Sequence, residues 1–229
     1  MAVIPAFNEE ASIGVVVSAV RSIGITEVTV VDDCSTDSTA VVASQAGAKV
    51  LSLADNGGAW LATQAGLRFA LERGFKQAVT LDADGQHFAS LIPDLLSPIS
   101  EGIANTVVGA CQERGNRRRH LAWAWLRTLS GVGVGDITSG MRAYDKQSLD
   151  ILTSRVASFI NYQDVGLLLL LRSAGLSITE VSVEMAPRSE GKSKIFDSWL
   201  SVASYLWYST MLSITKRSFR FPEKTKRRQ

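Results

Sequence analysis

Val79-Thr80-Leu81-Asp82-Ala83-Asp84-Gly85-Gln86-His87 places two aspartates, one residue apart, directly after an apolar run. On a strand, alternate residues project from the same side, so Asp82 and Asp84 would face one site at the strand's carboxyl end, and Gln86 could join them. Such oxygen ligands suit Mg²⁺ or Mn²⁺, which in turn bind phosphate oxygens. The stretch therefore predicts a metal–diphosphate site, although a strand ending in an ordinary Asp/Gly turn explains the same residues.

The chain on both sides of this stretch alternates apolar strands with helical patterns. This alternation predicts an α/β fold, a mainly parallel sheet with helices on both faces, in which ligands bind beyond the carboxyl ends of the strands. Polar clusters at Pro5–Glu9, Asp32–Asp33 and Asp82–Asp84 all follow predicted strands, so we expect them at one edge. The predicted strands are 2–6, 28–31, 48–53, 77–82 and 106–110. One predicted helix contains residues 13–20, and a second is capped by Ser35 or Asp37 and runs to about residue 46. Two more predicted helices cover 56–73 and 91–99.

Composition and missing motifs narrow the class of protein. The 229 residues suit one large domain, and the two cysteines, Cys34 and Cys111, have no metal-binding spacing, which favours a reducing cytoplasm. No secretory signal is expected, since a core strand follows Met1 at once. No G-x-G-x-x-G follows the first strand and no Walker lysine motif occurs, so a dinucleotide dehydrogenase and a P-loop kinase are disfavoured. A hydrolase triad is unsupported, because there are two histidines and Ser35 lies in no nucleophile elbow.

Five motifs in order resemble those of inverting family-two glycosyltransferases, and most closely the dolichyl- and polyprenyl-phosphate sugar transferase branch. The resemblance covers roughly residues 2–195 and implies the GT-A fold, a nucleotide-sugar donor and a Mg²⁺ or Mn²⁺ ion. It therefore suggests a GT-A domain over 1–195, followed by an apolar helix and a basic tail over 196–229. The motifs are Pro5-Ala6-Phe7-Asn8-Glu9-Glu10, Val31-Asp32-Asp33-Cys34-Ser35-Thr36-Asp37, Asp82-Ala83-Asp84-Gly85-Gln86-His87, Asp136-Ile137-Thr138-Ser139-Gly140-Met141-Arg142 and Arg188-Ser189-Glu190-Gly191-Lys192-Ser193-Lys194.

The resemblance also implies a role for each matching residue. Arg188 and Lys194 would act in catalysis as well as in binding, because their positive charge would stabilise the leaving diphosphate together with the metal. A plain basic surface loop is the alternative for this stretch. The implied nucleoside contacts are Pro5, Phe7, Glu9, Val31 and Asp33; Asp82 and Ala83 line the nucleotide–sugar site; Asp84 and Gln86 bind the metal; and Arg188 and Lys194 contact the diphosphate.

The sequence departs from the family pattern in three places. Gly109-Ala110-Cys111 lacks an arginine that the family usually has after this strand; Arg114, Arg117, Arg118 or Arg119 could replace it. Gly58-Ala59-Trp60 lacks a lysine that commonly opens the next helix. Asp164, in Gln163-Asp164-Val165, is the candidate for a catalytic base, although a helix N-cap explains it equally well. An anionic phosphate acceptor would hardly need a strong base.

The C-terminal third combines further elements with a charge asymmetry. Helices are expected at 149–156 and 165–171 and a strand at 178–183, and residues 198–215 carry no charge. From Lys216 to Gln229, seven Lys/Arg and one Glu give a net charge of +6, so the remaining 215 residues of a chain with a net charge of +2 carry −4. A helix lying in the membrane interface beside a basic tail fits this pattern. The alternatives are a helix packed on the domain and a solubilising tail.

The sequence therefore predicts an inverting, metal-dependent glycosyltransferase that transfers a sugar from a UDP- or GDP-sugar to a polyprenyl phosphate. A soluble or glycan acceptor is the second hypothesis. Two further hypotheses remain. One is a nucleotidyltransferase, which would need a Gly-rich basic loop after the first strand; the other is a non-catalytic relative that binds a nucleotide sugar. The expected location is the cytoplasm, peripheral at the inner face of the membrane. A small membrane protein or a second copy of the chain is a candidate partner, and no nucleic-acid partner is expected.

Overall fold

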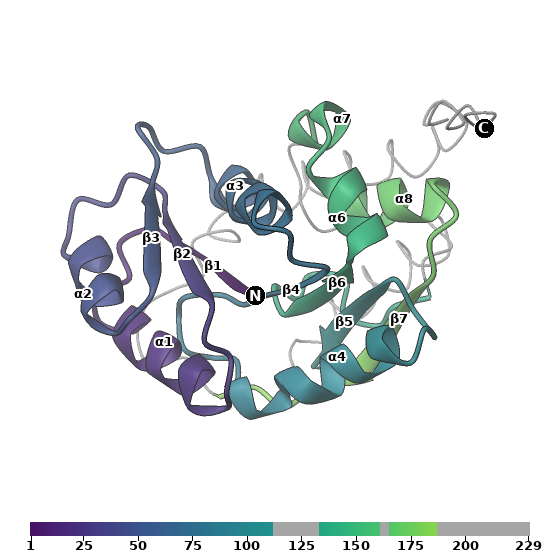
Figure 1. Ribbon diagram of the computed structural model, residues 1–229, viewed down its shortest axis with the longest axis horizontal. Helices are drawn as coiled ribbons and strands as arrows, with labels where there is room; N and C mark the ends of the chain where they lie inside the picture. Colours follow the sequence, from purple (N-terminus) through teal and green to yellow (C-terminus); the bar gives the residue numbers. More distant parts are fainter. Residues whose placement is uncertain (112–132, 161–164, 187–229) are drawn as a thin grey trace, which may run out of the picture.

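The computed structural model describes residues 1–111, 133–160 and 165–186, and these form one seven-stranded sheet with helices on both faces (Figure 1). The strand order is β3-β2-β1-β4-β6-β5-β7. Every pairing is parallel except those of β6, which runs antiparallel to both β4 and β5. The strands are β1 Ala2–Ala6, β2 Val28–Asp32, β3 Lys49–Ser52, β4 Gln77–Thr80, β5 Thr106–Ala110, β6 Arg142–Asp145 and β7 Ile178–Ser182.

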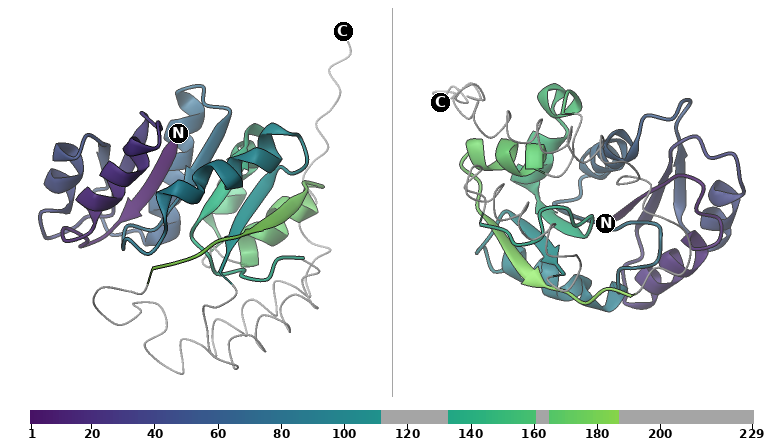
Figure 2. Two further views of the ribbon diagram at one scale, coloured as in Figure 1. Left: turned by 90° about the horizontal axis from the view of Figure 1, so that it is seen from below. Right: turned by 180° about the vertical axis from the view of Figure 1, so that it is seen from behind.

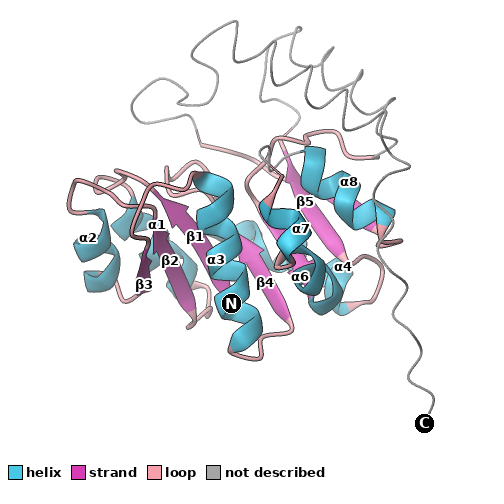
Figure 3. Cartoon of the chain, turned by 90° about the horizontal axis from the view of Figure 1, so that it is seen from above, coloured by secondary structure: helices cyan, strands magenta, loops and turns pink. Residues whose placement is uncertain are grey.

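Helices α1, α2 and α4 cover one face of the sheet, and α3, α6 and α8 cover the other. The two faces have separate apolar cores, because alternate residues of a strand point to opposite sides: Ile4 packs with α1 and α4, whereas Val3 packs with α3. Figure 2 shows the first face from below, and Figure 3 shows α3, α6 and α8 from above. The helices are α1 Ile13–Ser22, α2 Thr39–Gln45, α3 Ala59–Glu72, the 3₁₀ turn η1 Ala89–Leu91, α4 Ile92–Ser100, α6 Lys146–Leu152, α7 Arg155–Ser158 and α8 Val165–Ser173.

The observed elements confirm the predicted α/β fold and correct several details. β4 ends at Thr80, so Asp82 and Asp84 lie in the turn after the strand rather than on it. The helix expected at 149–156 is two helices, α6 and α7, because Thr153 ends the first and Ser154 caps the second by accepting from the Ala157 amide. The antiparallel strand β6 has no counterpart in the sequence-based assignment.

Helix α2 also begins later than its predicted cap. Its N-cap residue is Ser38, not Ser35 or Asp37, and Asp37 instead accepts hydrogen bonds from the Thr39 backbone and hydroxyl. Burial raises the pKa of Asp37, but hydrogen bonds from Thr39 and from the Glu10 backbone outweigh it and hold that pKa below its ordinary value. Asp37 thus joins the start of α2 to the segment after β1.

Within the described residues, no helix has both the length and the apolar character required to cross a membrane. The segments 112–132, 161–164 and 187–229 lie outside the described residues. The predicted domain boundary at residue 195 and the predicted C-terminal helix and tail at 196–229 therefore also lie outside them.

Candidate active site

The segments after β1 and β2 are bonded to each other at the carboxyl edge of the sheet. The Asn8 amide donates to Ser35 Oγ at 3.0 Å, and the Glu9 amide donates to Thr39 Oγ1 at 2.8 Å. Asn8 Oδ1 in turn accepts from the Thr36 amide at 2.8 Å. Asn8 and Cys34 both have left-handed backbones, with φ of 53° and 61°, which turns the chain sharply after each strand. The Asp33 amide also donates to the Ala6 carbonyl at 2.8 Å, so the polar clusters at Pro5–Glu9 and Asp32–Asp33 are connected.

Asp33 anchors the loop that leads into α3. Its carboxylate accepts from the Gly57 amide at 2.7 Å and from the Gly58 amide at 2.8 Å, and its backbone carbonyl accepts from Asn56 at 3.2 Å. The residue is only 3% exposed. Asp33 lies at the predicted edge, but both of its carboxylate oxygens already bind backbone amides. A contact with a nucleoside stays a prediction for this residue.

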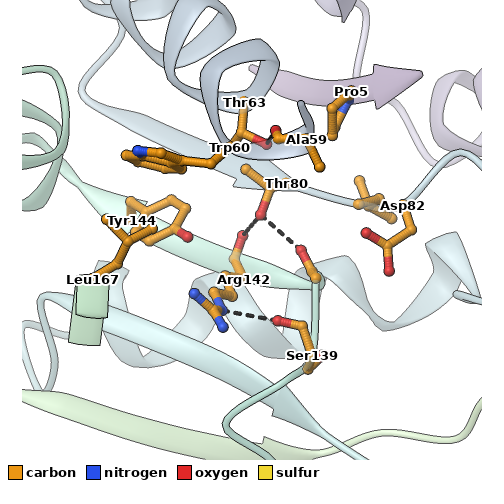
Figure 4. A pocket seen from close by; sticks show the side chains of 12 residues that line it. Pro5, Ala59, Trp60, Thr63, Thr80, Asp82, Ser139, Arg142, Tyr144 and Leu167 are labelled. Carbon is orange, nitrogen blue, oxygen red and sulfur yellow. Dashed lines mark hydrogen bonds between the residues drawn. The ribbon is translucent and has the colours of Figure 1, made fainter. Parts of the chain in front are cut away.

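Asp82 lines a pocket between β1, α3, β4 and the segment before β6 (Figure 4). Its side chain is 40% exposed, and Oδ2 lies 3.1 Å from Nε2 of His87. Thr80, two residues earlier, donates its hydroxyl to the Gly140 carbonyl at 2.9 Å and so binds the segment before β6 to β4. The lining residues are Pro5, Ala59, Trp60, Thr63, Thr80, Leu81, Asp82, Ser139, Gly140, Arg142, Tyr144 and Leu167.

Asp84 and Gln86 form the next part of the edge. Asp84 Oδ1 accepts from the Gln86 amide at 3.1 Å, and Gly85 between them has φ of 75°, which a side chain would strain. The Gln86 backbone carbonyl accepts from the Ala186 amide at 2.9 Å, while its side-chain Nε2 donates to the Ala186 carbonyl at 3.2 Å. His87 and Met185 form an antiparallel bridge beside this pair. The chain that continues toward Arg188 is therefore attached to the aspartate motif.

The oxygen atoms at this edge fit the ligand preference of a hard divalent cation. Asp82 and Asp84 supply carboxylates, and the amide of Gln86, whose nitrogen is bonded to Ala186, offers its oxygen. The described residues hold no cluster of three or more His, Cys, Asp or Glu that would enclose an ion. Mg²⁺ commonly keeps several waters and uses one or two carboxylates plus substrate phosphates, so this sparse set suits a metal completed by a diphosphate.

The structure brings some of the predicted site residues together and leaves others apart. Pro5 and Asp82 share the pocket, whereas Phe7, 37% exposed, lies on the loop after β1. Val31 and Ala83 are buried in the apolar cores, so their side chains pack against protein. Asp164, Arg188 and Lys194 lie outside the described residues, as do Arg114, Arg117, Arg118 and Arg119.

Arg142 is a pocket residue to which the sequence assigned no role. It is 4% exposed and donates from Nε to the Ser139 carbonyl at 2.9 Å and from Nη2 to the Ile137 carbonyl at 2.8 Å. Cys111, where the family usually has arginine, is buried in the core. The signal that could have identified Arg142 was its place at the end of the Asp136–Arg142 motif.

The sheet is mainly parallel and has carboxylates and a pocket at the carboxyl ends of its strands, which is where proteins of this architecture bind their ligands. The model of the glycosyl transferase family 2 matches residues 1–159, and the chain belongs to this family. It is a glycosyltransferase with a GT-A fold.

Curated relatives and a solved structure align with most of the chain. An undecaprenyl-phosphate mannosyltransferase of Micrococcus luteus is 30% identical over 216 residues, covering 85% of this chain and 86% of that protein. A polyprenol monophosphomannose synthase of Mycolicibacterium smegmatis is 28% identical over 228 residues, covering 90% and 84%. A glucosyl-3-phosphoglycerate synthase of Mycobacterium tuberculosis, crystallised with Mn²⁺ and UDP-glucose, has a TM-score of 0.69 and 25% identity, covering 93% of this chain and 77% of its own.

Proposed function

We propose that this protein transfers a sugar, with inversion, from a nucleoside-diphosphate sugar to a polyprenyl phosphate. The anomeric C–O bond to the diphosphate breaks, a new C–O bond forms to an acceptor phosphate oxygen, and the nucleoside diphosphate leaves. The observation that carries the proposal is the turn of Asp82, Asp84 and Gln86 at the sheet edge, beside a pocket and bonded to Ala186. The lipid-phosphate activities named for the two curated relatives support the choice of acceptor.

The residues of the chain would divide the work of this reaction. Asp84 and the Gln86 amide would hold Mg²⁺ or Mn²⁺, which supplies positive charge to the leaving diphosphate. Asp82 would orient the donor at the mouth of the pocket. Arg188 and Lys194, which follow Ala186 in the sequence, would add positive charge to the same diphosphate. The acceptor phosphate is already anionic, so Asp164 is a weaker candidate for an essential base.

The test is a donor screen that follows release of the nucleoside diphosphate. UDP- and GDP-sugars are offered with Mn²⁺ or Mg²⁺, with and without a polyprenyl phosphate, and each reaction is repeated with a chelator. We expect release only with metal, and faster release when the lipid phosphate is present. Glucosyl-3-phosphoglycerate synthase, also crystallised with phosphoglyceric acid, makes a soluble phosphorylated acceptor the second candidate. Release stimulated by that acceptor alone would replace the lipid in our proposal.

The same proposal places the protein at the inner face of a membrane. Residues 198–215 carry no charge and the segment from Lys216 onward is strongly basic, a pair of features that suits binding to an anionic lipid surface. Such attachment would bring the site to a lipid acceptor whose phosphate lies at the headgroup level.

A further inference from the structure

A buried histidine contacts the carboxylate that lines the pocket. The His87 side chain is 1% exposed, and its Nε2 lies 3.1 Å from Asp82 Oδ2. The other ring nitrogen, Nδ1, has no hydrogen-bond partner within the described part of the chain. An ionised carboxylate only accepts hydrogen bonds, so in this contact Nε2–H is the donor and Asp82 Oδ2 is the acceptor. Among residues 1–111, 133–160 and 165–186, the ring therefore has a single polar contact, the one with Asp82.

The position of the ring is fixed by the backbone around it. His87 pairs with Met185 in an antiparallel bridge, and its neighbour Gln86 exchanges two hydrogen bonds with Ala186. The bridge holds the imidazole at the end of a paired segment rather than on a free loop. His87 can therefore hold the Asp82 carboxylate in place from one side.

Gly140 also packs closely against the Asp82 carboxylate. A Cβ atom at Gly140 would come within 2.6 Å of both Cγ and Oδ2 of Asp82, and closer still to Oδ1. The Gly140 backbone is not among those with positive φ, so the residue is glycine for space and not for conformation. The Gly140 carbonyl accepts a hydrogen bond from Thr80 Oγ1 at 2.9 Å, which attaches the Gly140 segment to β4.

We infer that His87 and Gly140 are positioning residues that hold the Asp82 carboxylate in the orientation required for donor binding. The inference rests on the proposed function, in which Asp82 orients the nucleotide sugar. Both contacts limit rotation of a side chain that is 40% exposed, and a rotated carboxylate would no longer face the donor. Nε2 of His87 contacts Oδ2, and Gly140 lies so close to the carboxylate that a Cβ atom there would overlap it. Geometric errors of about 1 Å in a site cost large factors in rate.

A purely structural role for His87 would give a different result in a matched pair of variants. His87→Gln keeps a donor nitrogen near the place of Nε2, whereas His87→Asn has a polar side chain too short to reach Asp82. We expect Gln to retain most of the affinity for UDP or GDP with Mn²⁺, measured by calorimetry, and Asn to lose roughly tenfold or more. A packing role predicts similar thermal destabilisation in both variants and unchanged nucleotide affinity in each, which would overturn the inference.

Coupling to Asp82 provides the second test. In an Asp82→Ala background, His87→Asn and Gly140→Ala should cause no further loss of nucleotide affinity, because both act through the missing carboxylate. Gly140→Ala should also lower the melting temperature of the wild-type protein but not of Asp82→Ala, where the overlapping atoms are gone. Gly133→Ala is the matched control, since a Cβ there meets nothing within 4 Å.

The outcomes separate the inference from the proposed function. Additive losses in the Asp82→Ala background would show that the two residues act elsewhere and would overturn the inference alone. Wild-type protein that binds neither UDP nor GDP in the presence of Mn²⁺ would overturn the proposed function and the inference with it. Variants that fail only when Asp82 is present would support both.

Discussion

Asp84 is the side chain whose removal should stop transfer with the least damage to the fold. It lies in a half-buried turn outside the apolar cores, and we propose that it binds the metal. Asp84→Ala should lower turnover by roughly a hundredfold or more, because the leaving diphosphate loses the cation's charge. Nucleoside-diphosphate release and thermal unfolding measure the two effects. Asp94→Ala, which removes an exposed carboxylate from α4, is the control and should leave turnover unchanged.

Asp33 should show a different balance between stability and binding. Its carboxylate accepts from two backbone amides, so Asp33→Ala leaves the Gly57 and Gly58 N–H groups without their partner and frees the start of α3. We expect a loss of about 1–3 kcal/mol in the free energy of unfolding, together with weaker donor binding. Asp33→Asn, which keeps one acceptor oxygen, should lose less of both. Denaturant unfolding and donor titration test this; unchanged stability in Asp33→Ala would contradict the anchoring role.

Individual residues of the site were predictable where their chemistry is visible in the sequence. Asp82 and Asp84 stand out as paired carboxylates, and Gln86 follows at the same spacing. His87 and Gly140 do not. Gly140 lies 58 residues from Asp82 along the chain, and the position of the His87 ring depends on a bridge to Met185. Spacing along the chain identifies candidate metal-binding side chains more readily than it identifies the residues that position those side chains.

Helix α3 should depend on a glycine at its contact with the sheet. A Cβ atom at Gly66 would overlap Val3 Cγ1 and lie 3.0 Å from Val31 Cγ2. Gly66→Ala gains about 1 kcal/mol of helix propensity, but overpacking of a tight core costs about 1–3 kcal/mol, so we expect a net loss or no gain. Adding Val3→Ala makes room for the new methyl group. In denaturant unfolding, the double variant should lose less stability than the sum of the losses of the two single variants. Strict additivity of the two losses would rule out the predicted overlap.

At the level of elements, the sequence was informative where periodicity is strong. The parallel strands β1, β2, β4 and β5 are short apolar runs, and each was predicted to within two residues. Strand β6 was missed because Arg142-Ala143-Tyr144-Asp145 shows neither an apolar run nor alternation. Its strand conformation comes from pairing with β4 and β5 on both sides. Nε and Nη2 of Arg142 donate to carbonyls of the loop that precedes the strand. Tertiary pairing outweighs local preference here.

At the scale of the whole molecule, charge is distributed unevenly along the chain. The final 14 residues carry +6 and the rest carries −4, so the whole chain is nearly neutral while its end is strongly basic. Each Lys or Arg near an anionic surface contributes roughly 1 kcal/mol of attraction, which salt screens over a Debye length of about 8 Å. Two weak membrane signals, an apolar segment and a basic one, are usually needed for stable attachment.

Deletion of residues 216–229 tests whether this asymmetry serves the lipid acceptor. Full-length protein should sediment with anionic vesicles at low salt and be released as salt rises, whereas the shortened protein should stay in the supernatant. Transfer to a long-chain polyprenyl phosphate in vesicles should fall with the deletion, because the enzyme is no longer concentrated at the surface. Transfer to a short, water-soluble acceptor analogue should not change, since Asp82, Asp84 and Gln86 are untouched. Full-length protein that ignores anionic vesicles at low salt would refute membrane attachment through this segment and make a soluble acceptor the better choice.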